Sequence, residues 1–293
     1  MSAPDTNEAE VSALPYVVSA DVRLLLEGWA KTADFKMPEE RFFEELREEF
    51  STYMKKIFPS FEFLHENTIL AEMQELMKEC GLPIVSLDRA YWHSNLAIEL
   101  SRNVGTDMSD LGLAPRSGTP SLEQQVSFIA SQAVEVVLVD DVIFSGDLIE
   151  SVITSLKRCG VGVRAVYAAV GVANGVNRVQ QHVEKVRCIR LYRAVRDEVC
   201  ERDFYPGVPF SGRSLVGGDN VGLPYVLPFG NPVEWASIPQ DCVDDFSRFC
   251  IRQTRTLFRE IGRVSEREVR CCDLPRKVHK ISSSNKRFVD VLS

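Results

Sequence analysis

Two adjacent carboxylates, Asp140 and Asp141, follow a run of apolar residues, and a short loop with Ser145 and Gly146 comes next. The apolar run at residues 134–139 predicts a buried strand, and the periodicity of residues 148–159 predicts a helix. In parallel α/β sheets, ligands bind beyond the carboxyl ends of strands, and the start of a helix offers free N–H groups to a phosphate. Gly146 lets the backbone approach an anion closely, while Ser145 supplies a hydroxyl donor.

The two carboxylates would repel a phosphate, so they require other partners. Ribose hydroxyls and Mg²⁺ suit them, because hard cations prefer oxygen ligands. We therefore expect a sugar-phosphate site in which Asp140 and Asp141 act as catalytic and metal-binding residues. The alternative is a buried strand whose two aspartates only cap the next helix.

The elements around this segment alternate as in a parallel α/β sheet. Between residues 104 and 124 the chain is rich in Gly, Pro, Ser and Asp, which predicts a long functional loop. The residue pattern predicts strands at 83–87, 163–172 and 186–192, and helices at 90–102 and 177–185. The predicted fold class is α/β, with a Rossmann-like parallel sheet.

Both ends of the chain differ from this centre. Residues 1–82 predict a helical N-terminal extension, with helices at 21–31, 38–57 and 67–80 after ten polar, acidic residues that predict disorder. Residues 201–293 predict an irregular, aromatic-rich segment, a helix at 241–262 and a basic tail. We therefore expect three parts: 1–82, an α/β core at 83–200, and a hood-like C-terminal part at 201–293.

The segment 136–148 resembles the signature of the type I phosphoribosyltransferase family, which binds phosphoribosyl pyrophosphate (PRPP). That signature is an apolar strand, two acidic residues, two apolar positions and a Gly loop rich in Thr or Ser. The resemblance implies that Asp140 and Asp141 hold the ribose hydroxyls. It also implies that the loop Phe144, Ser145, Gly146 and Asp147 wraps the 5-phosphate. The chain departs from the signature at Leu148, where the family usually has Thr or Ser, and Asp147 adds a negative charge beside the phosphate.

The likeness extends from about residue 83 to 192 and implies a type I phosphoribosyltransferase fold with further site residues. Arg89 would bind pyrophosphate, with Asp88 assisting Mg²⁺; the alternative is a helix cap with Arg89 in solvent. Arg116 lies where the family has a flexible loop that closes over pyrophosphate; the alternative is a plain surface loop. A base would contact residues that follow the last strand and that alternatively pack a core: Asp203, Phe204 and Tyr205.

Composition limits the remaining possibilities. The chain has 293 residues, 45% of them hydrophobic, and a net charge of −8, which argues against a broad nucleic-acid surface. It has neither an apolar run of the ~20 residues that span a bilayer nor the features of a signal peptide. The eight cysteines and four histidines match no zinc spacing, and the cysteines are expected to be free thiols. We expect a cytoplasmic protein without membrane contact.

Two regions suggest partners. The basic stretch at 263–287 suggests a nucleic acid or an acidic protein, with a solvated tail as the alternative. The aromatic stripe of the N-terminal helices suggests a core or, second, a surface for a homo-oligomer.

The function expected from the resemblance is transfer of phosphoribose from Mg-PRPP to or from a nitrogenous base. The alternative is a catalytically weak regulatory module that binds PRPP or a nucleotide. A related alternative is a nucleotide-modifying effector of a bacterial defence system, acting in a protein or nucleoprotein complex.

Overall fold

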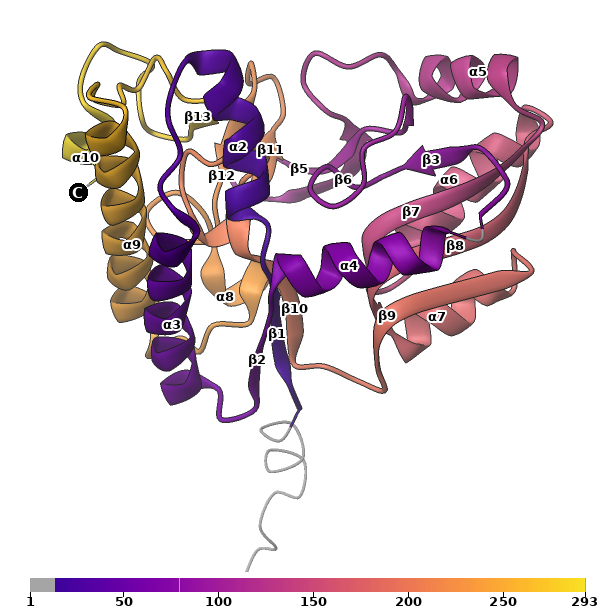
Figure 1. Cartoon of the computed structure of the whole chain (residues 1–293), viewed down its shortest axis with the longest axis horizontal. Helices are drawn as coiled ribbons and strands as arrows, with labels where there is room; N and C mark the ends of the chain where they lie inside the picture. The colour runs from indigo at the N-terminus through magenta and orange to yellow at the C-terminus, as the bar shows by residue number, and fades with distance from the viewer. Residues whose placement is uncertain (1–13, 79, 293) are drawn as a thin grey trace, which may run out of the picture. The chain divides into compact units, whose positions relative to one another are not determined.

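The chain divides into two units in the computed structural model, which describes residues 14–78 and 80–292 (Figure 1). Unit 1 comprises the described residues up to Leu64, the segment Asn103–Leu111 and the described residues from Arg196 onward. Unit 2 comprises His65–Arg102 and Gly112–Val195. The predicted disorder of residues 1–10 concerns residues outside the described part of the chain.

Unit 2 contains a five-stranded parallel sheet with the order β4-β3-β7-β8-β9, which places this unit in the predicted α/β class. The central strands are almost wholly apolar because helices cover both faces of the sheet. In Figure 1, α4 crosses in front of β8 and β9, whereas α6 and α7 lie behind the sheet. The elements are β3 (Ile84–Ser86), β4 (Leu96–Ala97), β7 (Glu135–Ile143), β8 (Gly162–Val172), β9 (Lys185–Tyr192), α4 (Glu66–Met77), α5 (Leu122–Gln132), α6 (Asp147–Arg158) and α7 (Ala173–Gln180).

The helix predicted at 90–102 is wrong, since this segment holds β4 and the start of β5 (Leu100–Val104). The reason is local. Asp88 accepts hydrogen bonds from the backbone N–H groups of Ala90, Tyr91 and Trp92, which turns the chain immediately after β3. The Ser94 hydroxyl then donates to the Ile84 carbonyl at 2.6 Å and brings the chain back to pair as β4.

The long loop predicted at 104–124 is also more ordered than expected. It contains β6 (Asp110–Pro115) and the first residues of α5. A capping box starts α5: the Ser121 hydroxyl accepts from the Gln124 N–H at 3.3 Å, and the Gln124 side chain accepts from the Ser121 N–H at 3.0 Å.

Unit 1 contains a three-stranded parallel sheet in the order β10-β1-β2. A second sheet has the order β13-β12-β11-β5-β6. Its strands β11, β12 and β13 belong to unit 1, as do the parts of β5 and β6 that lie within residues 103–111. The elements of unit 1 are β1 (Tyr16–Ser19), β2 (Phe61–Leu64), β10 (Asp197–Cys200), β11 (Arg213–Leu215), β12 (Val221–Leu223), β13 (Lys277–Val278), α2 (Val22–Ala33), α3 (Glu40–Ile57), α8 (Pro232–Ala236), α9 (Val243–Val264), α10 (Phe288–Val291) and the 3-10 helix η1 (Glu201–Phe204).

The structure thus divides the chain differently from the three predicted parts. The region 1–82 is not wholly helical, because β1 and β2 lie within it, and α4 belongs to unit 2. Most of the N-terminal and C-terminal regions form one unit, joined where β1 pairs with β10 from Tyr16↔Asp197 to Ser19↔Cys200. Strands of four residues are too short to show a periodicity, and their pairing across about 180 residues leaves no local signal.

Three buried charged residues, Asp21, Arg47 and Glu201, form a network in unit 1 with Arg202, whose side chain is 12% exposed. These four residues are called the buried ion network. The Arg47 guanidinium donates two hydrogen bonds of 3.0 Å to the Glu201 carboxylate, and their side chains are only 5% and 2% exposed. Glu201 also accepts from the backbone N–H groups of Asp21 and Val22 at 3.2 Å. Asp21 forms an ion pair with Arg202 and accepts from its backbone N–H at 2.9 Å. Each buried carboxylate therefore has a cation and backbone donors.

Candidate functional site

The acidic pair lies near the end of β7, at the centre of the unit 2 sheet. The strand continues through both acids to Ile143, because Val142 and Ile143 pair with Val170 and Gly171 of β8. The prediction that the strand ends at Val139 was therefore too short by four residues. Asp140 is 4% exposed, whereas Asp141 is half-buried.

A third carboxylate, that of Asp88, lies close to this pair. It follows β3, which is the parallel neighbour of β7, with Ser86 in register with Val139. The carboxyl ends of adjacent parallel strands meet at one edge of the sheet, so the acids after β3 and near the end of β7 come together. The structure therefore brings Asp88 close to Asp140 and Asp141, which lie about 50 positions later in the sequence. All three are predicted site residues.

The electrostatics of this acidic cluster favour uptake of a proton or a cation. Burial raises the pKa of Asp140 well above its usual range, and the carboxylates of Asp141 and Asp88 raise it further. Burial and Asp141 also raise the pKa of Asp88, while the N–H groups donated by Ala90, Trp92 and Tyr91 oppose that shift. Strongly shifted carboxylates held beside one another are a common feature of functional sites.

The donor chemistry of the acidic cluster suits Mg²⁺, since carboxylate oxygens are ligands that this hard cation accepts. The carboxylate of Asp88 is already engaged by three backbone N–H groups. Within the described residues, no group of three or more His, Cys, Asp or Glu side chains is arranged so that it could hold a metal ion. A cation here would therefore need oxygen atoms from a ligand or from water.

The predicted phosphate loop connects β7 to α6. Gly146 has a φ of +81°, in the left-handed region that glycine adopts without strain, and it forms the N-cap of α6. A side chain there would also meet the Gly175 carbonyl oxygen at 2.9 Å. Conversely, a Cβ on Gly175 would overlap the Phe144 carbonyl. Two glycines therefore allow the loop to pack directly against the start of α7, and Gly175 was not identified from the sequence.

Asp147 is the first residue of α6, and its charge is balanced within unit 2. It forms an ion pair with Arg178 of α7 and accepts a 2.6 Å hydrogen bond from the Ser145 hydroxyl. The Ser145 hydrogen bond and Arg178 hold the pKa of Asp147 below its usual range, so it stays ionised. Arg178 also donates to Glu150 at 2.6 Å. Arg178 thus offsets the negative charge that Asp147 places beside the loop, and no local motif pointed to this arginine.

Arg89 does not extend into solvent. It forms an ion pair with Glu99, and both side chains are about one-quarter exposed, at 25% and 27%. Burial lowers the pKa of Arg89, an effect that nearby Asp88 opposes. The Glu99 backbone is itself held, because its N–H donates to the Gln125 side chain at 2.6 Å. Arg89 therefore lies beside the acidic cluster, with its charge engaged by Glu99.

Arg116 begins a tight turn between β6 and α5. Its N–H donates to the Glu99 carbonyl at 3.0 Å, and its carbonyl accepts from the Thr119 N–H at 3.1 Å. Gly118 completes the turn with a φ of +80°. Because the chain around Arg116 is fixed to the same Glu99 that pairs with Arg89, both predicted pyrophosphate ligands are linked to one residue.

The predicted base-binding residues lie in unit 1, in and after η1. Phe204 and Tyr205 are 0% and 1% exposed. Phe204 packs against Phe50 and Phe246, with ring centroids 5.7 and 5.2 Å away. This burial leaves neither ring a free face for stacking on a base, so the core alternative describes them. The Asp203 carboxylate accepts from the Gly212 N–H at 2.7 Å.

The basic stretch at 263–287 is folded rather than a solvated tail. Arg276 is 5% exposed and donates to the Ser214 hydroxyl at 3.0 Å. Lys277 forms an ion pair with Asp219 at 2.6 Å. Intramolecular contacts therefore occupy both of these cations.

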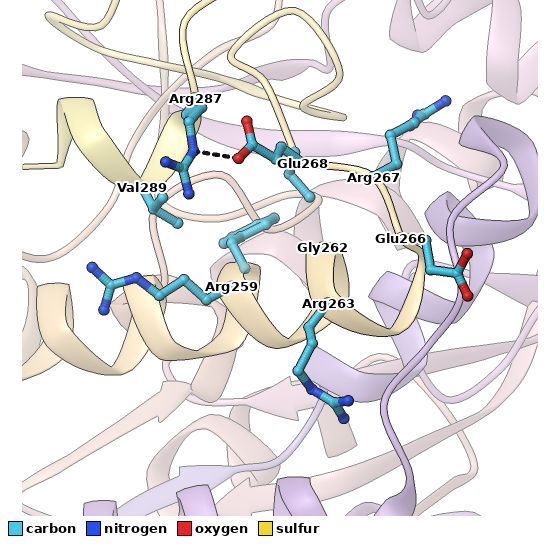
Figure 2. A pocket seen from close by; sticks show the side chains of 10 residues that line it. Arg259, Gly262, Arg263, Glu266, Arg267, Glu268, Arg287 and Val289 are labelled. Carbon is cyan, nitrogen blue, oxygen red and sulfur yellow. Dashed lines mark ion pairs between the residues drawn. The ribbon is translucent and has the colours of Figure 1, made fainter.

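Part of the same stretch borders a pocket of about 310 Å³ at the C-terminal end of α9 (Figure 2). Phe258 and Val269 are among the residues that line it. Arg287 forms an ion pair with Glu268 at 3.0 Å. Figure 2 shows this pair, with the side chains of Arg259 and Arg263 pointing in different directions. These arginines do not converge on one point, so the pocket lacks the geometry of an anion site.

Comparison of the chain with protein-family models and with curated proteins finds no match. Among the described residues, no helix combines the length and the apolar composition required to cross a bilayer.

Proposed function

We propose that this protein binds Mg-PRPP, or a nucleotide with the same sugar phosphate, through a type I phosphoribosyltransferase-like core in unit 2. The observation that carries the proposal is the acidic cluster of Asp88, Asp140 and Asp141 beside the Gly146 loop and the start of α6. Carboxylates that repel one another suit ribose hydroxyls and Mg²⁺, and the N–H groups of a first helical turn suit a phosphate.

In the proposed reaction, a nitrogen atom of a base attacks the anomeric carbon of PRPP. The new bond joins nitrogen to carbon, and the bond from carbon to the pyrophosphate oxygen breaks, so that pyrophosphate leaves with the electron pair. Asp140 and Asp141 hold the ribose, and residues 144–147 hold the 5-phosphate. Arg89 supplies positive charge to the leaving group once it exchanges Glu99 for pyrophosphate. Mg²⁺, when bound, neutralises the pyrophosphate charge.

A second candidate is binding without efficient transfer, as in a regulatory module or an effector that acts within a complex. Three observations favour it. Arg89 is engaged by Glu99, Phe204 and Tyr205 are buried, and Leu148 replaces a hydroxyl residue of the family signature. Loss of that hydroxyl removes one hydrogen bond to phosphate, worth about 1 kcal/mol.

Calorimetry with Mg-PRPP tests the binding that both candidates share. The double variant Asp140→Asn with Asp141→Asn should weaken binding at least tenfold, since hydrogen bonds to charged groups contribute about 1.5–3 kcal/mol each. The matched control, Glu123→Gln with Glu184→Gln, removes two exposed carboxylates of unit 2 and should bind as the wild type does. If the wild type does not bind Mg-PRPP, the proposal is rejected.

Pyrophosphate release separates the two candidates. Purified protein with Mg-PRPP and a panel of nucleobases should release pyrophosphate only if the chain is a transferase. Binding without release would establish the regulatory or effector candidate instead.

A further inference from the structure

Unit 2 has a pocket of about 540 Å³ between α4 and the strands β8 and β9. This volume is within the ~300–1,000 Å³ typical of small-molecule sites. Helix α4 contributes Ala71, Glu72, Glu75 and Leu76 to its wall. The proposed PRPP site uses none of the residues that line this pocket.

The strand pattern places two cations and an aromatic ring on one face of the sheet. Lys185, Arg187 and Ile189 alternate along β9, so their side chains point to the same side. Tyr167 of β8 is in register with Arg187 and shares that face. The Lys185 ammonium lies 5.6 Å from the centre of the Tyr167 ring.

Cys188 follows Arg187 in β9, and its thiol lies beside Gly171 of the neighbouring strand β8. Burial raises the pKa of this thiol to about 12, so it stays protonated and is not a nucleophile.

The charges of the pocket are unevenly matched. The Glu72 carboxylate accepts two hydrogen bonds from Arg190, at 2.9 and 3.0 Å, and the Glu75 carboxylate pairs with Lys78. Within the part of the chain that the structure describes, Lys185 and Arg187 have no carboxylate partner. Since the acids are neutralised and the two cations are not, the pocket favours an anion.

We propose that this pocket binds a small organic phosphate of about the size of a nucleoside monophosphate. Lys185 and Arg187 would hold the phosphate, because an ammonium and a guanidinium together neutralise it and donate several hydrogen bonds. The apolar side chains of Leu76 and Ile189 would contact the organic part of the ligand. The ligand would thus bind against the α4 face of the sheet, in a site separate from the acidic cluster.

The test uses adenosine monophosphate, adenosine and inorganic phosphate as probes in calorimetry on the full chain. Adenosine monophosphate should bind, whereas adenosine lacks the charge and phosphate lacks the apolar contacts, so each should bind at least tenfold more weakly. The variant Lys185→Gln with Arg187→Gln should weaken binding of adenosine monophosphate at least tenfold. Ala71→Trp, which fills the pocket from the exposed side of α4 and keeps both cations, should have the same effect.

Two control variants make the result specific. Lys157→Gln with Arg158→Gln removes the same charges from the last turn of α6, and it should bind as the wild type does. Asp141→Asn should weaken any binding of adenosine monophosphate at the proposed PRPP site, and it should leave unchanged the binding that Lys185→Gln with Arg187→Gln removes.

The proposal is overturned if adenosine monophosphate does not bind, or if neither Lys185→Gln with Arg187→Gln nor Ala71→Trp weakens its binding. It is equally overturned if the α6 control weakens binding as much. Loss of binding in Asp141→Asn alone would place the ligand at the acidic cluster, which contradicts the α4 pocket and supports the proposed function.

Discussion

Both units place carboxylates at or near the carboxyl ends of parallel strands, and the two groups differ in how their charges are compensated. In unit 1, Glu201 and Asp21 are held by Arg47, Arg202 and backbone N–H groups in the buried ion network. In unit 2, burial and neighbouring aspartates raise the pKa values of Asp88 and Asp140, whereas in unit 1 the Arg202 guanidinium opposes the rise in the pKa of Asp21. A buried charge is tolerated when a cation and hydrogen-bond donors compensate it, and removal of its partner is strongly destabilising. Adjacent like charges instead disfavour the ionised state unless a ligand or a proton joins them. We therefore infer a structural role for the first group and propose a binding role for the second.

The largest expected effect is a loss of stability when the buried ion network of unit 1 is broken. Arg47→Ala leaves the Glu201 carboxylate buried without its guanidinium, which should lower the free energy of unfolding by about 3–5 kcal/mol. Chemical denaturation followed by circular dichroism measures it. As a matched control, Arg41→Ala breaks an exposed pair with Glu45 in the same helix and should change stability by less than about 1 kcal/mol. Equal effects of the two variants would contradict the structural role of the network.

We expect Mg-PRPP binding in unit 2 to depend on the contact between the loop at residues 144–147 and α7. Gly175→Ala introduces a methyl group that overlaps the Phe144 carbonyl, so the loop must move. We expect a loss of about 1–3 kcal/mol in stability, as for overpacking elsewhere, together with weaker Mg-PRPP binding. Gly28→Ala is the control, since nothing lies within 4 Å of the added methyl group in α2. It should stabilise the protein by about 0.5–1 kcal/mol. Wild-type Mg-PRPP binding by Gly175→Ala would show that the loop geometry is not required.

The stability of the protein should depend on pH through Asp21 of the buried ion network, in a way that an exposed ion pair would not produce. Burial raises the pKa of Asp21 to about 8, an effect that Arg202 opposes and Glu201 reinforces. The folded state therefore holds this proton more tightly than the unfolded state, in which the pKa is about 3.9. Between about pH 4 and pH 8, the contribution of Asp21 to stability falls as pH rises, by at most about 1.4 kcal/mol per pH unit.

Denaturation of the wild type and of Asp21→Asn at pH 5 and pH 8 measures this contribution. The wild type should lose more stability than the variant on going to the higher pH. A difference between the two proteins that does not depend on pH would show that Asp21 titrates in its ordinary range.

The smallest expected effect concerns the departure from the family signature. Leu148→Thr restores a hydroxyl in the first turn of α6, which should strengthen Mg-PRPP binding by about 1 kcal/mol, or roughly fivefold. Leu148 is partly buried against the core of unit 2, so stability should fall slightly. Calorimetry measures the affinity, and Leu148→Val, which also shortens the side chain but has no hydroxyl, is the control. An equal gain with valine would exclude the hydrogen bond as the cause.

The sequence by itself determined the parts of unit 2 whose signals are local. The apolar run before Asp140, the glycine at position 146 and the helix after it each follow from neighbouring residues, and together with the elements around them they predicted the parallel α/β sheet. These elements form as expected because strand and helix preferences act over a few residues.

Only the tertiary structure decided which charged and aromatic side chains are available to a ligand. The pairing of Arg89 with Glu99, the balance of Asp147 by Arg178 and the burial of Phe204 all depend on residues distant in the chain. The same holds for the joining of β1 to β10, which unites the two ends of the chain in unit 1. Such contacts leave no periodic trace in one sequence, because their partners are set by the packing of whole elements rather than by neighbouring residues.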